Sequence, residues 1–237
     1  IKETIHSFSP DIIFHLAAQP LVRESYLKPV ETWSTNVMGT ISILEALRDS
    51  KKKVIFIGIT TDKVYHNNEW IYGYRENDRL GGTDPYSSSK AATELAINSW
   101  KKSFAYDKDL HISSARAGNV VGGGDYSKDR IIPDIFRSLK QNKVLCIRNP
   151  NSTRPWQHVL EPLSGYLTLA VNMKNNKNLC GEAFNFGPIQ QKNYTVLDVV
   201  KEISKRWNDV KFKIESDKNQ LFHESNLLKL NCDKALE

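Results

Sequence analysis

A tyrosine and a lysine stand four positions apart in the stretch Tyr86-Ser87-Ser88-Ser89-Lys90. In a helix, residues with this spacing lie on one face, so both side chains can reach one ligand. A lysine ammonium beside a phenol favours the phenolate, and we expect Lys90 to lower the pKa of Tyr86. A phenolate can take the proton of a hydroxyl group while the carbon gives hydride to a nicotinamide ring.

The spacing alone is weak, because a chain with nine tyrosines contains about one such pair by chance. Without context, an exposed tyrosine and a surface lysine are the more common arrangement. Here Asp84-Pro85 is a helix-start signal directly before Tyr86. Thr61 stands at the end of an apolar run, and ligands of open α/β sheets bind at such strand ends. The context therefore favours a site.

Apolar runs and helical spacing alternate along the chain. The first helix is expected to begin near Pro29 and to place one apolar face toward the core, formed by Val30, Trp33, Val37, Ile41, Leu44 and Leu47. Short apolar runs predict buried strands at 12–16 and 54–59, and further strands are predicted at 110–116, 144–148 and 183–187. Further helices are predicted at 86–105, 131–141, 159–174 and 195–207, with loops at 62–85 and 172–178. This rhythm predicts an α/β fold, a Rossmann-like doubly wound parallel sheet.

Composition narrows the classes of function. A net charge of +6 would suit a nucleic-acid binder, but the basic residues are scattered among acids, which is typical of a solvated surface. We expect no nucleic-acid partner and, without a long apolar run, no membrane span. Cys146, Cys180 and Cys232 lie far apart, which predicts neither disulfides nor zinc and favours a reducing cytoplasm. No cluster has metal-ligand spacing.

The motifs together resemble the extended short-chain dehydrogenase/reductase family, and within it the CDP-glucose 4,6-dehydratase branch. Beside the Tyr86–Lys90 pair, the matching stretches are His15-Leu16-Ala17-Ala18-Gln19, Asn36-Val37-Met38-Gly39-Thr40, Thr60-Thr61-Asp62-Lys63-Val64-Tyr65, Arg116-Ala117-Gly118-Asn119 and Arg154-Pro155-Trp156-Gln157-His158-Val159. The segments 68–76 and 80–85 resemble the CDP-glucose branch in particular. The order and spacing are specific, although each short motif is not.

The resemblance implies NAD as cofactor and CDP-glucose as the nucleotide-sugar substrate. Tyr86 would take the C4 hydroxyl proton, Thr61 would hold the same oxygen, and Lys90 would also grip the nicotinamide ribose. Water then leaves from C6 after a proton leaves C5, which requires an acid and a base. Asp62 is the expected acid, and Lys63 the expected base or a group that positions a water molecule or the ketone. A surface Asp–Lys pair in a loop is the alternative for these two residues.

Other residues are expected around cofactor and substrate. The resemblance assigns Ala17, Ala18 and Gln19 to the cofactor, beside Tyr86 and Lys90, and Asn119 and Arg154 to the diphosphate. An arginine fork suits phosphate oxygens, whereas Asn119 could instead form a turn. Trp156 and His158 either line the nucleotide side or pack in the core. Asn36 is expected to connect strand loops, and His15 to be a core histidine with its hydrogen bonds satisfied.

The domain boundaries follow from the same resemblance. Residues 1–120, rejoined by 158–190, are expected to form a partial NAD-binding Rossmann domain, and 121–157 with 191–237 a smaller, truncated substrate-binding domain. The chain carries no glycine-rich dinucleotide turn before residue 12, and its first and last residues have helical patterns without caps. We therefore expect a fragment that lacks both termini and the first strands of the sheet.

Two other functions remain open. An epimerase or reductase of the same family would share Tyr86 and Lys90 but has no need for the acid and base after Thr61. A non-catalytic fragment that binds a nucleotide sugar or a protein partner is the second alternative. Relatives commonly pair through helices like 29–48 and 86–105, so the resemblance implies a homodimer or higher homo-oligomer. It also implies a place in deoxysugar biosynthesis for lipopolysaccharide O-antigen.

Overall fold

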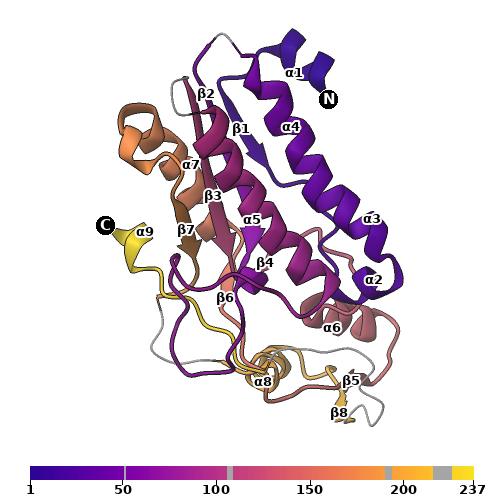
Figure 1. Cartoon of the computed structure of the whole chain (residues 1–237). Coiled ribbons are helices and arrows are strands. Elements are labelled where there is room, and N and C mark those ends of the chain that lie inside the picture. The colour runs from indigo at the N-terminus through magenta and orange to yellow at the C-terminus, as the bar shows by residue number, and fades with distance from the viewer. Residues whose placement is uncertain (51, 106–108, 190–193, 216–225) are drawn as a thin grey trace.

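The computed structural model describes residues 1–50, 52–105, 109–189, 194–215 and 226–237. Its centre is a parallel sheet of four strands in the order β1-β2-β3-β7 (Figure 1). The strands are β1 (Ile12–His15), β2 (Val54–Thr61), β3 (Leu110–Ala117) and β7 (Ala183–Phe186). Nearly every residue of β2 and β3 is buried, which is typical of a sheet covered on both faces. The predicted Rossmann-like α/β fold is confirmed.

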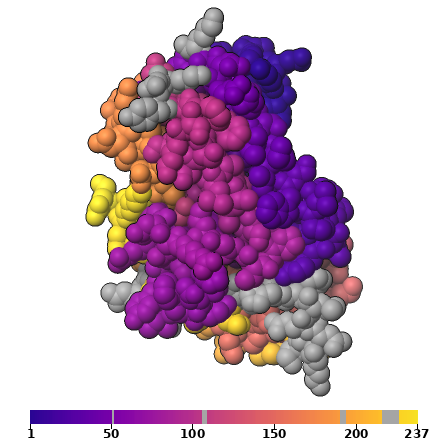
Figure 2. All heavy atoms as spheres, viewed as in Figure 1, coloured from indigo at the N-terminus to yellow at the C-terminus, as the bar shows by residue number. Residues whose placement is uncertain are grey.

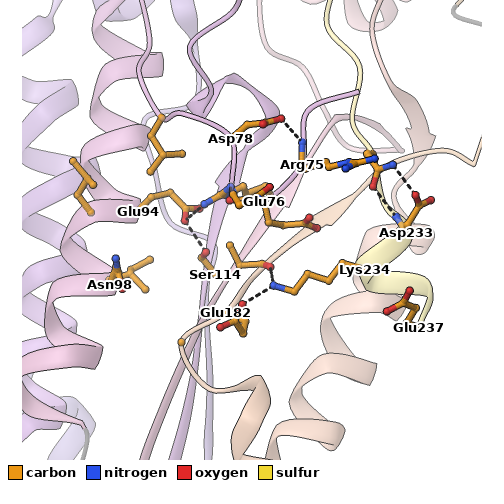
Figure 3. A pocket seen from close by; sticks show the side chains of 18 residues that line it. Arg75, Glu76, Asp78, Glu94, Asn98, Ser114, Glu182, Asp233, Lys234 and Glu237 are labelled. Carbon is orange, nitrogen blue, oxygen red and sulfur yellow. Dashed lines mark hydrogen bonds and ion pairs between the residues drawn. The ribbon is translucent and has the colours of Figure 1, made fainter. Parts of the chain in front are cut away.

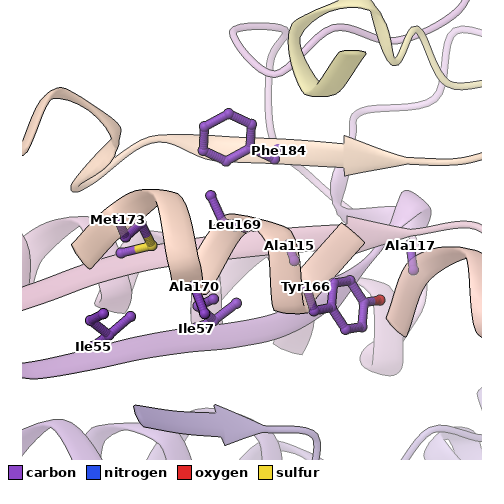
Figure 4. Packing of buried hydrophobic residues seen from close by; sticks show 9 residues of the cluster. All are labelled: Ile55, Ile57, Ala115, Ala117, Tyr166, Leu169, Ala170, Met173 and Phe184. Atoms are coloured by element: carbon purple, nitrogen blue, oxygen red, sulfur yellow. The ribbon is translucent and has the colours of Figure 1, made fainter. Parts of the chain in front are cut away.

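Alternate residues of β2 point to the two faces of the sheet. Ile55 and Ile57 pack under α7 (Leu160–Asn175), in the core cluster that Figure 4 shows. Val54 and Phe56 point the other way, toward a second cluster that includes residues of α5 (Pro85–Phe104). Burying one such side chain contributes about 1.5–3 kcal/mol, so the two clusters fix the helices on both faces.

The first long helix is interrupted. It consists of α3 (Pro29–Trp33), a π-helical turn η1 (Ser34–Met38) and α4 (Gly39–Arg48). Leu44 and Leu47 are fully buried as predicted, but Val30 is 82% exposed and Trp33 41% exposed. The prediction of one continuous buried face is wrong because the wider π turn shifts the phase of the side chains around the axis.

A smaller group of elements lies beyond the carboxyl ends of the sheet strands (Figure 1). It consists of α6 (Ile131–Lys140), β5 (Leu145–Ile147), α8 (Val196–Arg206) and β8 (Phe212–Ile214), with β5 and β8 paired in parallel. These elements share a core of their own around Ile135, Ile147 and Val200. The predicted division into two domains is compatible with this core and stays a prediction. Residues 191–193 and 216–225 of the second expected domain lie outside the described residues.

Short elements are the ones that the sequence pattern does not reveal. They include α2 (Val22–Leu27), η2 (Asp62–Val64), η3 (Lys177–Leu179) and the parallel pair β4 (Asn119–Val121) and β6 (Trp156–His158). The chain also has helices α1 (Lys2–Phe8) and α9 (Asp233–Leu236) near its ends. The loop expected at 172–178 is partly helical, because α7 continues to Asn175.

The segment between η2 and α5 forms a lobe at the surface beside α5, purple in Figure 2. A bridge between Tyr65 and Leu80 closes its base. Gly82 lies so close to the first turn of α5 that a Cβ atom would be 2.3 Å from the backbone of Ser87. Glycine at this position therefore permits the lobe to press against the helix start.

Candidate active site

The carboxyl end of β2 and the 3-10 turn η2 hold three of the predicted residues, Thr61, Asp62 and Lys63. The Thr61 hydroxyl donates to Oδ1 of Asp62 at 2.9 Å and accepts from the backbone N–H of Lys63 at 3.4 Å. Thr61 is 7% exposed and Asp62 is 1% exposed. Within the described part of the chain, Oδ2 of Asp62 is buried without a hydrogen-bond partner. An incompletely satisfied buried carboxylate is costly, and such groups are frequent where chemistry is done.

Tyr86 approaches this strand end from the first turn of α5. Asp84 caps the helix by accepting from the backbone N–H of Ser87 at 2.9 Å, and Pro85 occupies the first helical turn. The Thr61 side chain lies close enough to the Tyr86 hydroxyl to lower the pKa of the phenol. Residues that are 25 positions apart in the sequence therefore meet in one buried cluster, which we call the strand-end cluster: Thr61, Asp62, Lys63, Tyr86 and Lys90.

The pKa of Tyr86 differs from the expectation. Burial, with the negative charges of Asp62 and Asp84, raises the pKa of Tyr86 to about 12, whereas Lys90 was expected to lower it. The Lys90 ammonium donates instead to the backbone carbonyl of Ile59 at 3.0 Å. Burial lowers the pKa of Lys90 to about 8, although Glu94 opposes this shift. The predicted direction is wrong because burial of the phenol outweighs the cationic neighbours.

Lys63 has a lowered pKa, which a lysine needs if it is to act as a base. Burial lowers its pKa from the ordinary value, and the positive charge of Arg154 lowers it further, while Asp62 works in the opposite direction. Its ammonium lies 3.6 Å from Oδ1 of Asp62, and its side chain is 20% exposed. The alternative of a solvated surface pair does not fit Asp62, whose side chain is 2% exposed.

Arg130 is a neighbour that the sequence analysis missed. It is the N-cap residue of α6, and its positive charge lowers the pKa of Tyr86, opposing the effect of burial. Its guanidinium also donates to Asp125 at 3.2 Å. The one sequence signal was an arginine directly before the predicted helix 131–141, which by itself indicates nothing about a site.

Residues predicted for the substrate lie on β4, β6 and the segment before β6. Asn119 is paired with Trp156 across the two strands, and Gly118 permits this approach, because a Cβ there would lie 2.5 Å from Pro155. Arg154 is half-buried and close enough to Lys63 to affect its pKa. This places Arg154 beside the strand-end cluster, as expected of a group that binds a charged substrate.

Trp156 and His158 are not core residues. The indole of Trp156 donates to the backbone carbonyl of Tyr194 at 3.2 Å. His158 is exposed, and its Nδ1 accepts from the backbone N–H of Leu160 at 3.3 Å at the start of α7. Their contact with a nucleotide stays a prediction.

Residues predicted for the cofactor follow the end of β1. Ala17 is exposed and Ala18 half-buried, so the backbone here is not covered by large side chains. Gln19 is held by Asn36, whose side chain accepts from the Gln19 N–H at 2.8 Å and donates to Ser89 at 2.9 Å. Asn36 therefore connects the loop after β1 to helix α5, whereas it was predicted to connect two strand loops. His15 is a buried core residue, bonded to Thr40 at 3.0 Å, and burial lowers its pKa to about 4.

A pocket of about 620 Å³ lies elsewhere, along α5 and the edge strand β7 (Figure 3). Its buried wall contains an ion pair, in which Arg116 donates to Glu94 at 2.9 Å. Glu94 also accepts from Thr60 and Ser114, and Arg116 also donates to the Tyr65 hydroxyl, which donates to Asn185. We call these residues the Glu94 cluster: Thr60, Tyr65, Glu94, Ser114, Arg116 and Asn185. It contains none of the predicted site residues, and it ties the surface lobe to the sheet.

Other kinds of site have little support in the described residues. Within these ranges, no group of three histidine, cysteine, aspartate or glutamate side chains is arranged to hold a metal ion. Cys146, Cys180 and Cys232 are free thiols. The described helices include none with the length and apolar character that crossing a bilayer requires.

Comparison with known proteins agrees with the geometry. The CDP-glucose 4,6-dehydratase of Salmonella typhimurium strain LT2 is 46% identical to this chain over 99% of its length, and the chain spans 67% of that protein. The UDP-glucuronic acid 4-epimerase of Bacillus cereus, solved with UDP-glucuronic acid and NAD, superposes with a TM-score of 0.83 at 23% identity. The match covers 99% of this chain and 70% of the epimerase chain.

A dehydratase structure gives a similar result. The dTDP-glucose 4,6-dehydratase DesIV of Streptomyces venezuelae, solved with NAD and TYD, has a TM-score of 0.80 at 21% identity, covering 99% of this chain and 69% of that chain. At these identities the two structures establish the fold alone. The sequence profile of the GDP-mannose 4,6 dehydratase family matches residues 1–234. With nearly the whole chain matched, this protein belongs to the GDP-mannose 4,6 dehydratase family.

Proposed function

We propose that this protein carries out NAD-dependent 4,6-dehydration of a nucleoside-diphosphate hexose, with CDP-glucose as substrate and CDP-4-dehydro-6-deoxyglucose and water as products. The observation that carries the proposal is the strand-end cluster, in which Asp62 and Lys63 lie beside the Tyr86–Thr61 pair. The choice of CDP-glucose rests on the Salmonella relative, whose name states that substrate.

The cofactor site is supported by the residues around β1 and α5. NAD is bound in the structures of the B. cereus and S. venezuelae relatives. The small side chains of exposed Ala17 and half-buried Ala18 fit the close approach of a dinucleotide, and Lys90 would hold the nicotinamide ribose. When bound, the nicotinamide would accept hydride from C4 of the sugar and return it to C6.

Each protein group has a defined task in this reaction. Tyr86 takes the proton of the C4 hydroxyl as a phenolate, so its raised pKa must fall when cofactor and substrate bind, and Thr61 holds the same oxygen by a hydrogen bond. The C4 ketone acidifies the C5 proton, which the Lys63 amine can accept because its pKa is lowered. Asp62 gives a proton to the C6 oxygen as it leaves as water. Arg154 and Asn119 bind the diphosphate, with Trp156 and His158 on the nucleotide side.

The acid and base distinguish this function from epimerisation or reduction. Those reactions need the Tyr86–Lys90 pair but no acid and base for elimination. In this chain Asp62 is almost fully buried next to a lysine of lowered pKa, an arrangement that elimination uses and the other reactions do not. No observation on the described residues therefore favours epimerisation or reduction over dehydration.

The proposal is tested with the whole protein, loaded with NAD⁺ and given CDP-glucose. We expect a 4-keto-6-deoxy sugar, detected by its absorbance in base, without net formation of NADH. The same assay with dTDP-glucose, UDP-glucose and GDP-mannose measures the nucleotide preference. A product that keeps its C6 hydroxyl, or NADH that accumulates in proportion to substrate, would contradict the dehydratase assignment.

A second copy of the chain is proposed to cover the exposed apolar face of α3 and η1. This face contains an apolar pocket lined by Pro29, Val30, Trp33, Ser34, Val37 and Met38. A homodimer would bury Val30, Trp33 and Met38, which are exposed here. Light scattering of the wild-type protein and of Trp33→Glu tests this, with a monomeric wild type as the contrary result. We place the reaction in the cytoplasm, where free thiols persist.

A further inference from the structure

Helix α5 begins with backbone groups that the helix itself cannot satisfy, because the first N–H groups of any helix lack an intrahelical partner. Pro85 has no N–H, and Asp84 accepts from the N–H of Ser87. The N–H of Tyr86 donates instead to Oγ of Ser25 at 3.1 Å. Ser25 belongs to α2, which lies beside the start of α5 (Figure 1). A separate helix, 61 positions earlier in the chain, therefore completes the cap of α5 at Tyr86.

The direction of the Ser25 hydroxyl is fixed by its own helix. It donates its one proton to the backbone carbonyl of Val22 at 2.6 Å, so its lone pairs remain available to the N–H of Tyr86. Ser25 is 0% exposed, and bulk water therefore does not compete for this contact. The hydroxyl is an acceptor that is held in place before any ligand binds.

Helix α2 is in turn held by the loop after β1. The Gln19 side chain accepts from the backbone N–H of Leu21 at 2.6 Å and donates to the Leu21 carbonyl at 3.2 Å. Leu21 is the N-cap residue of α2, and Gln19 is one of the residues proposed to bind the cofactor. Ser25 therefore connects the proposed cofactor loop to the backbone of the proposed base at C4.

This connection matters because Tyr86 lies in the first turn of its helix. Helix ends fray more readily than helix interiors, so a side chain in the first turn is held less firmly by the helix itself. The phenol must meet the C4 hydroxyl while C4 faces the nicotinamide. In such an arrangement a misplacement of about 1 Å can slow the reaction by about 100-fold.

We propose that Ser25 is a positioning residue for the dehydration. Its hydroxyl holds the backbone of Tyr86, and thereby keeps the phenol aligned with a nicotinamide bound by the loop after β1. Ser25 acts through Tyr86 and not on the substrate. This inference rests on the proposed function and adds the contact that sets the base against the cofactor.

The test compares Ser25→Ala with Ser113→Ala. S25A removes the acceptor with little change in shape. Ser113 is the matched control because it is also 0% exposed and its hydroxyl also donates to a backbone carbonyl, that of Leu179, at 2.8 Å. It lies on β3 and has no contact with Tyr86 in the described hydrogen bonds. The two variants therefore lose similar buried groups, and only one of these groups holds Tyr86.

Kinetics of the whole protein with NAD⁺ and CDP-glucose give the first result. We expect S25A to lower kcat by roughly 10- to 100-fold, because the base is no longer aligned. The KM for CDP-glucose and the Kd for NAD⁺ should stay within about twofold of wild type, since alignment is needed in the transition state and not for binding. S113A should keep kcat within about twofold of wild type.

A second measurement needs no turnover. Burial raises the pKa of Tyr86 to about 12, so a phenol that moves toward water should ionise at lower pH. The ¹³Cζ resonance of labelled Tyr86, assigned with Tyr86→Phe, reports this ionisation. In cofactor-free protein at about pH 10.5, S25A should contain more phenolate than wild type, and S113A should match wild type. Circular dichroism at the same pH verifies that each protein is folded.

The outcomes separate the positioning role from the proposed function. If the wild type makes no 4-keto-6-deoxy product from any nucleotide hexose, the proposed function fails. Equal ionisation of Tyr86 in S25A and wild type would then overturn the hold of Ser25 on Tyr86 as well. If the wild type dehydrates its substrate but S25A loses no more kcat than S113A, or raises KM at unchanged kcat, Ser25 is not a positioning residue. A loss of kcat confined to S25A, at unchanged KM, supports the role.

Discussion

Helix α5 carries two buried polar clusters about two turns apart, and they differ in how completely their groups are paired. In the Glu94 cluster, both carboxylate oxygens accept hydrogen bonds and Arg116 donates to three partners. In the strand-end cluster, Oδ2 of Asp62 is buried without a partner in the described chain, and two lysines have lowered pKa values.

The difference separates a structural role from a reactive one. The Glu94 network pairs its carboxylate fully and holds the surface lobe against the sheet, although Nε of Arg116 is buried without a partner in the described chain. An incompletely paired cluster stores unfavourable free energy that a substrate hydroxyl or a proton can relieve. The comparison predicts that substitutions in the first cluster affect stability, whereas those in the second affect turnover.

The largest effect is expected from Tyr86→Phe. Removing the phenol oxygen leaves no base at C4, so kcat should fall by about 10³-fold. The free energy of unfolding should change by less than about 1 kcal/mol, because the ring remains buried and only a hydroxyl is removed. Product assays and urea unfolding of the whole protein measure the two quantities. Turnover within about tenfold of wild type would remove Tyr86 from the proposed mechanism.

Arg116→Met tests the other cluster. It leaves the Glu94 carboxylate buried without its cation, so the free energy of unfolding should fall by about 3 kcal/mol. The activity of the molecules that remain folded should stay close to wild type. The double variant with Glu94→Gln should recover part of the loss, since it removes the unpaired charge. Urea unfolding of both variants decides this, and an R116M protein that is stable but inactive would reverse the assignment of the cluster.

The sequence predicted the site better than its electrostatics. The positions of Thr61 at the end of β2 and of Tyr86 and Lys90 on α5 were predicted correctly, because helix spacing and strand ends are local patterns, while their roles stay a prediction. The raised pKa of Tyr86 was missed because it depends mainly on burial of the phenol, which only the tertiary fold produces. Arg130 was missed for the same reason, since α6 reaches the site only through the tertiary fold.

In the fold too, local sequence patterns predicted the long elements but not the features that depend on tertiary contacts. Strand β2 was predicted nearly to its end because a continuous apolar run specifies a buried parallel strand. The π turn η1 was not predicted, because the spacing from Val30 to Leu47 fits an uninterrupted helix. The short strands β4 and β6 lack a pattern of their own, and their pairing depends on Gly118 permitting close approach.

Within the strand-end cluster, Lys63→Met should separate oxidation from elimination. The first hydride transfer should persist, since Tyr86 and Thr61 are intact, but loss of water should slow by about 100-fold without a base at C5. Stopped-flow absorbance would then show NADH that forms and does not decay. Lys63→Arg is the matched control, because it keeps the charge and cannot act as a base. Dehydration at the normal rate in K63M would show that Lys63 is not the base.

The smallest effect concerns pH and Lys90. Its pKa is about 8 in the folded protein and 10.5 when unperturbed, so between these values the unfolded chain binds more protons. Stability should therefore rise with pH between about 8 and 10, by an amount on the order of 1 kcal/mol from this residue. Lys63 adds a slope of the same sign to the free energy of unfolding against pH, whereas Tyr86, with its raised pKa, opposes it above pH 10.

Urea unfolding of dinucleotide-free protein at pH 8, 9 and 10 should give a smaller slope of the free energy of unfolding for Lys90→Met than for wild type. Equal slopes would mean that Lys90 stays charged in the folded state, and the contrast between the two clusters would then rest on Asp62 and Lys63 alone.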